Sequence, residues 1–108
     1  MNDIEIIFDK IKVVENDFPE VSSVSIEKCK EAFNYIANDL FERITFYPDD
    51  FGGIQMRCTK ETGELVCVFG DICMSYYTLS CDGIPKFYAF QEYTERMYEK
   101  LAKKMRLL

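Results

Sequence analysis

The chain has 108 residues, with 13 Lys and Arg against 19 Asp and Glu, no histidine and a net charge of −6. This length fits a single domain over residues 1–108, and 48% hydrophobic residues are enough to pack one core. Because histidine is the usual general base near neutral pH, its absence excludes Ser-His-Asp and Cys-His catalysis within this chain.

The N-terminal and apolar segments argue against export and membrane insertion. The chain is acidic from Asp3 onward and lacks the positive and apolar regions of a signal peptide. Its longest apolar run covers residues 65–69, far short of the ~20 residues that span a bilayer. Five cysteines without a CxxC pair are typical of reduced thiols. We therefore expect a cytoplasmic protein that contacts no membrane.

Charge is divided unevenly along the chain. Residues 1–50 hold 12 acidic and 5 basic side chains, net −7, whereas residues 96–108 hold 1 and 5, net +4. An acidic body repels a phosphate backbone and attracts a basic surface. We therefore expect a protein partner with a basic surface rather than direct binding to nucleic acid. The basic C-terminal segment is interpreted as a solvated helix face, with phosphate contact as the alternative.

Two apolar stripes of helical period predict two N-terminal helices, separated by a break at Pro19. The first covers residues 3–15, with Ile4, Ile7, Phe8, Ile11 and Val14 on its apolar face. The second begins after an N-cap at Ser25 and runs to residue 44. Its apolar stripe contains Ile26, Cys29, Phe33, Ile36, Ala37, Leu40, Phe41 and Ile44.

From residue 54 the apolar period changes to two, and turn signals at residues 61–64, 70–71 and 82–83 predict a four-stranded antiparallel meander. Pro85 is compatible only with an edge strand, which is where the fourth strand would lie. The three turns set these pairs opposite each other: Cys58 and Cys67, Met56 and Phe69, Cys67 and Met74, Phe69 and Ile72, Tyr76 and Ala89, Thr78 and Phe87.

This register assigns the side chains to two faces. The face expected to be buried collects Ile54, Met56, Cys58, Leu65, Cys67, Phe69, Ile72, Met74, Tyr76, Phe87 and Ala89. The opposite face collects Gln55, Arg57, Thr59, Val66, Val68, Cys73, Ser75, Tyr77, Lys86 and Tyr88. That second face is either exposed, and then a candidate interface, or covered by the first helix.

The last segment, residues 91–108, is predicted to be helical from the stripe Tyr93, Met97, Leu101, Met105 and Leu108. The fold class is therefore α+β, with two N-terminal helices, a four-stranded antiparallel meander and a C-terminal helix in the order α-α-β-β-β-β-α. The helices are expected to cover one face of the sheet.

The cysteines do not have the spacing of a metal site. Cys58, Cys67, Cys73 and Cys81 lack a short C-x₂₋₄-C pair, so we interpret them as small buried side chains. Oxidation of Cys58 with Cys67 across the hairpin is a minor alternative. The adjacent carboxylates of Asp49 and Asp50 do not make a magnesium or glycosidase pair. We predict no metal, no cofactor and no catalytic residue.

The segment 45–53 is the most unusual stretch, because it combines three aromatic side chains, two carboxylates and two glycines. Aromatic anchors beside carboxylates are typical of a protein-binding loop. The alternative is a packed connector, in which Phe46 and Phe51 lie under the sheet and Asp49-Asp50 only begins a turn.

These features predict a small, non-enzymatic protein-binding inhibitor that blocks a basic partner by steric and electrostatic occlusion, as a mimic of nucleic acid. By analogy of class, bacterial toxin-immunity proteins and phage anti-defence proteins, including anti-CRISPR inhibitors, are small acidic chains. The alternative is a homodimeric structural or small-ligand-binding subunit that uses the open sheet face. An enzyme with a carboxylate or lysine base is a third option. The predicted partner-binding residues are Asp17, Glu20, Phe46, Tyr47, Asp49, Asp50 and Phe51.

Overall fold

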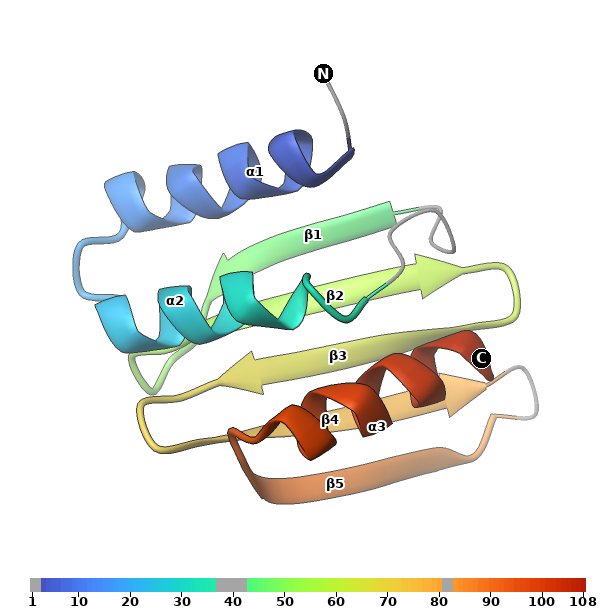
Figure 1. Ribbon diagram of the computed structural model, residues 1–108. Coiled ribbons are helices and arrows are strands. Elements are labelled where there is room, and N and C mark those ends of the chain that lie inside the picture. Colours follow the sequence, from blue (N-terminus) through green and yellow to red (C-terminus); the bar gives the residue numbers. More distant parts are fainter. Residues whose placement is uncertain (1–2, 37–42, 81–82) are drawn as a thin grey trace.

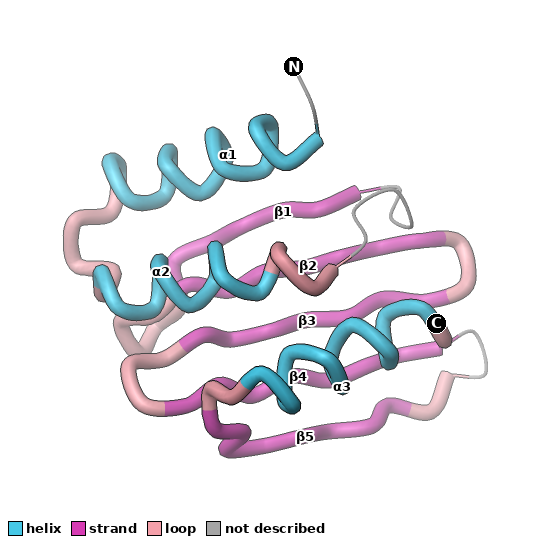
Figure 2. The backbone as a smooth tube through the Cα atoms, viewed as in Figure 1, coloured by secondary structure: helices cyan, strands magenta, loops and turns pink. Residues whose placement is uncertain are grey.

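The computed structural model describes residues 3–36, 43–80 and 83–108. In this part of the chain, three helices lie on one side of an antiparallel sheet of five strands in the order β1-β2-β3-β4-β5, so the fold is α+β (Figure 1). The smoothed backbone shows the same two layers (Figure 2). The elements are α1 (Asp3–Asp17), α2 (Ser23–Ala32), β1 (Arg43–Pro48), β2 (Ile54–Lys60), β3 (Gly63–Phe69), β4 (Cys73–Ser80), β5 (Pro85–Glu92) and α3 (Glu95–Arg106).

The prediction of four strands is wrong, because β1 forms where the second helix and the following loop were expected. Ile44 and Phe46 face the helices, while Thr45 and Tyr47 lie on the other face, and the strand pairs with β2 throughout. β-branched and aromatic side chains fit a pleated, half-buried surface. Ile44 continues a helical stripe equally well, and this coincidence of the two periods misled the prediction.

The helix boundaries also differ from the prediction. The second helix ends at Ala32, and its Phe33 cap is followed by turns up to Ile36. The predicted helical positions Ala37, Leu40 and Phe41 lie outside the described residues. The last helix begins at Glu95 rather than at residue 91, because the Thr94 side chain accepts a hydrogen bond from the Met97 amide (3.1 Å) and caps it there.

The predicted strand register is wrong by two residues at the first two hairpins, whereas the predicted faces are right. Cys58 lies opposite Leu65 rather than Cys67, and Phe69 lies opposite Met74 rather than Ile72. A shift of two residues keeps every side chain on its face. All the predicted core residues of β2, β3 and β4 are accordingly buried, but Ile72 is in the turn and 87% exposed.

An irregularity between β4 and β5 changes the face of the last strand. The register shifts by one between Met74 and Tyr76, and Phe90 on the opposite strand has a left-handed φ of 55°. Tyr76 therefore pairs with Tyr88 instead of Ala89. Phe87, predicted to be buried, is 73% exposed on the open face. As predicted, the strand that begins with Pro85 lies at an edge of the sheet.

The core lies between the helices and one face of the sheet. The predicted stripe of α1 is buried at Ile7, Ile11 and Val14. α1 is bound to the edge strand β1, where the Lys10 ammonium donates to the Ile44 carbonyl (3.0 Å). No helix covers the second sheet face in the described part of the chain (Figure 2).

Candidate functional site

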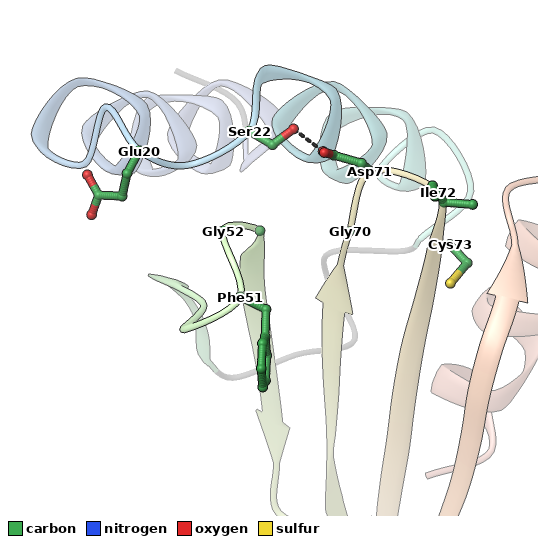
Figure 3. A pocket seen from close by; sticks show the side chains of 9 residues that line it. Glu20, Ser22, Phe51, Gly52, Gly70, Asp71, Ile72 and Cys73 are labelled. Carbon is green, nitrogen blue, oxygen red and sulfur yellow. Dashed lines mark hydrogen bonds between the residues drawn. The ribbon is translucent and has the colours of Figure 1, made fainter.

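Three chain connections meet at one end of the molecule, on the left in Figure 1. They are residues 18–22 between α1 and α2, residues 49–53 between β1 and β2, and residues 70–72 between β3 and β4. The Ser22 amide donates to the Gly52 carbonyl (2.8 Å), and the Ser22 hydroxyl donates to the Asp71 carboxylate (Figure 3). These bonds tie all three connections together, and we name this region the acidic end.

The β1–β2 turn has a fixed backbone. The Asp49 amide donates to the Gly53 carbonyl (2.8 Å), and the Asp49 carboxylate accepts from the Phe51 amide (3.1 Å). Gly52 takes a left-handed φ of 91°, which a residue without a Cβ adopts at little cost. Asp49 thus builds the turn, whereas Asp50 projects from it with an exposed side chain.

A pocket of about 450 Å³ opens at this end between the three connections (Figure 3). Glu20 and Asp71 bring carboxylates to its wall, and Phe51 and Ile72 line it with apolar side chains. Phe51 is 95% exposed and makes no part of the core. An aromatic ring left in water beside carboxylates is an arrangement typical of a protein-contact surface.

Charge at the acidic end has one sign. The three connections and the last residue of α1 contain five acidic side chains and no Lys or Arg: Asp17, Glu20, Asp49, Asp50 and Asp71. Like charges held together on a folded surface repel, and they attract a cationic surface at a distance set by the ionic strength. The arrangement can therefore orient and hold a basic partner.

Of the seven predicted partner-binding residues, the structure brings five to the acidic end: Asp17, Glu20, Asp49, Asp50 and Phe51. Phe46 packs inward against Phe33, with ring centres 5.9 Å apart. Tyr47 lies on the open face, and its hydroxyl is 2.7 Å from the Thr45 hydroxyl. The segment 45–53 is therefore a strand followed by a tight turn.

Two residues of the acidic end, Asp71 and Ile72, were not predicted as part of the site. Their sequence marks a turn, and the predicted register put Ile72 in the core. The sequence did contain an indication that both side chains are exposed, because the two central residues of a tight turn point into water. Whether these exposed residues belong to the site depends on which other turns lie at the same end of the sheet.

The open face of the sheet is a second candidate surface. A row of paired residues crosses it: Thr45, Arg57, Val66, Tyr77 and Phe87. Val66 is only 2% exposed between its neighbours, and the Arg57 Nε is buried without a hydrogen-bond partner in the described residues. A shallow groove along this row is lined by Val66, Val68, Ser75, Tyr76, Tyr77, Phe87, Tyr88 and Ala89.

The buried thiols lie away from both surfaces. Cys29, Cys58 and Cys67 are free and buried, and burial raises the pKa of the Cys58 thiol to about 12 and those of the other two well above the usual range. These thiols therefore stay protonated at neutral pH. Cys73 is free and half-buried on β4, whereas Cys81 lies outside the described residues.

Within residues 3–36, 43–80 and 83–108, no group of three or more Cys, Asp or Glu side chains is placed to hold a metal ion. No helix in these ranges has the length and apolar character needed to cross a bilayer. No protein-family model, curated protein or solved structure matches the chain.

Proposed function

We propose that this protein binds a basic surface of another protein through its acidic end, and inhibits that partner by occupying the surface. The observation that carries the proposal is that three chain segments meeting at one end bring five carboxylates and no basic side chain there, together with the 95% exposed Phe51. The partner is a protein that handles nucleic acid or a toxin with a cationic active surface.

Charge, an apolar anchor and a fixed backbone each favour binding of a basic partner at the acidic end. Carboxylates at one end attract a cationic surface during approach and raise the association rate. Phe51 then supplies an apolar anchor, the type of residue that gives most of the energy in an interface. The turn beneath it is already fixed by hydrogen bonds, so little backbone order has to be gained on binding.

The proposed mechanism requires no chemical step by this chain. The protonated, buried thiols and the absence of histidine support a role by contact alone. The protein is then an inert scaffold that holds charges at one end.

The test is capture of partners from the native host with the purified chain and with two variants of equal charge. The first variant combines Glu20→Gln, Asp50→Asn and Phe51→Ser at the acidic end. The control combines Asp9→Asn and Glu99→Gln with Val13→Ser, all at exposed helix positions away from it. We expect a partner retained by wild type and control and lost by the first variant, with association slowed about tenfold at low salt. A partner captured equally by all three proteins would contradict the proposal.

A second candidate is a homodimer that packs two open sheet faces together. The exposed Phe87 and the unpartnered Arg57 Nε favour it. If a two-fold axis runs along β3, each Val66 meets its copy and each Arg57 lies over the Tyr77 of the other chain, where a cation–π contact forms. Light scattering separates the candidates, because a monomer at all concentrations overturns the dimer and leaves the inhibitor proposal intact.

A further inference from the structure

A second cavity, of about 340 Å³, lies between α3 and the outer strands of the sheet and shares no lining residue with the pocket at the acidic end. Helix α3 lies over β4, next to the edge strand β5 (Figure 1). Tyr76 and Tyr88 come from the strands, and Lys100, Lys103 and Lys104 come from the helix. This volume is within the ~300–1,000 Å³ range of small-molecule pockets.

The two tyrosines form an aromatic wall. Their rings stack with centres 4.7 Å apart and planes at 17°, a contact that the irregular pairing of β4 with β5 creates. Tyr76 is 5% exposed, and within the described residues neither hydroxyl makes a hydrogen bond to another side chain or to the backbone. Burial, followed by the neighbouring Tyr88, raises the pKa of Tyr76 to about 12, so its hydroxyl stays a donor.

The three lysines form the opposite wall. Positions 100, 103 and 104 share one helix face, and within the described part of the chain none of their ammonium groups has a carboxylate within 4.0 Å. The Lys104 Nζ is held 5.2 Å from the centre of the Tyr88 ring. Arg96 and Arg106, the other bases of this helix, do not line the cavity. A basic last turn suits any helix dipole, but the dipole does not require the lysines to converge on one cavity.

The remaining polar side chain of the cavity supplies no charge to balance the lysines. The Gln91 amide donates to the Ala89 carbonyl (2.8 Å), so one of its hydrogens is already used. Two tyrosines and three lysines therefore line the cavity, without an ionised acceptor among the residues that line it. Side chains that can donate hydrogen bonds and carry positive charge favour a ligand that is rich in acceptors and negatively charged.

We propose that this cavity binds a small oligophosphate, either as the phosphate chain of a nucleotide or as inorganic tripolyphosphate. Oligophosphates carry several negative charges along a short chain and offer acceptor oxygens, which matches a cavity lined by three lysines. This site is independent of the acidic end and of the function proposed for it. Because the whole chain has a net charge of −6, binding depends on these local lysines and weakens as salt rises.

The test is calorimetric titration of the full chain, at low salt, with adenosine triphosphate, inorganic tripolyphosphate and adenosine. We expect both phosphates to bind and adenosine to give no heat. Tighter binding of the nucleotide would identify nucleotides as the source, and equal affinity would identify the phosphate chain alone. Absence of heat with both phosphates, or binding of adenosine as tight as that of its triphosphate, overturns the proposal.

Variants locate the binding. Tyr76→Phe removes one hydroxyl and keeps the stacked ring, and we expect affinity to fall about fivefold with unchanged circular dichroism. Lys100→Gln with Lys103→Gln should weaken binding by more than about tenfold. The control, Lys12→Gln with Arg106→Gln, makes the same change of charge outside the cavity. An equal loss in the control would show adsorption by net charge alone and would overturn the site.

Discussion

The acidic end and the lysine cavity carry opposite charges and are built in different ways. At the acidic end, backbone hydrogen bonds fix the turns, and side chains such as Asp50 and Phe51 project into water. In the cavity, the tyrosines belong to strands and the lysines to a helix, and Tyr76 is at the same time part of the core. Side chains on turns can therefore change without loss of the fold, whereas cavity side chains serve the fold and the ligand together.

The largest expected effect comes from breaking the backbone of the acidic end. A Cβ at Gly53 would clash with the Phe69 carbonyl oxygen on the neighbouring strand. We expect Gly53→Ala to reduce the free energy of unfolding by about 3 kcal/mol, because fixed backbone cannot yield as a side chain does. Urea denaturation measures this loss, and partner capture should disappear with it.

Gly52→Ala is the matched control in the same turn. Nothing lies within 4 Å of a Cβ built at Gly52, so its only cost is the left-handed φ, roughly 1 kcal/mol. If the two variants were equally destabilised, packing against β3 would not be what fixes this end, and the contrast between backbone and side chains would fail.

A smaller effect separates the two neighbouring carboxylates. Asp49→Ala removes the acceptor of the Phe51 amide and should cost about 1 kcal/mol of unfolding free energy, as the loss of a local cap does. Asp50→Ala should not lower the unfolding free energy, because this side chain makes no hydrogen bond in the described residues. Thermal denaturation of the two variants tests the difference, and equal melting temperatures would contradict it.

Much of the fold could be predicted from the sequence where the apolar pattern fits only one type of secondary structure. The alternation in β2, β3 and β4 assigned the buried face correctly, even though the register was two residues off, because the side-chain period is two. Prediction failed at Ile44, where helical and strand periods coincide, and at Phe87, where a one-residue irregularity reversed the faces. An irregularity of this kind depends on tertiary packing and leaves no turn signal in the strand.

For the candidate sites, individual residues could be predicted from the sequence, whereas their arrangement in space could not. The sequence identified Asp17, Glu20 and Phe51 separately, since each lies in a segment with turn residues. Their convergence depends on which connections share one end of the sheet, and that required the correct number of strands. The lysine cavity needed still more, because the stacking of Tyr76 on Tyr88 results from the irregular register of β5.

The smallest expected effect concerns the cost of keeping like charges together. Glu20 and Asp50 are exposed among other carboxylates, so each adds repulsion without a compensating contact in the described residues. Glu20→Gln with Asp50→Asn should therefore raise the free energy of unfolding by roughly 0.5 kcal/mol at low salt, a gain that screening removes at high salt. Denaturation of wild type and variant at two salt concentrations measures both changes.

The acidic end then differs from the lysine cavity in one further respect. Residues whose removal stabilises the fold but weakens partner capture are retained for contact, because the fold gains nothing from them. In the cavity, Lys104 also contacts the Tyr88 ring, so its replacement by Gln should lower stability slightly rather than raise it. If neutralisation at the acidic end lowered stability as well, its carboxylates would be structural, and the functional contrast between the two regions would be lost.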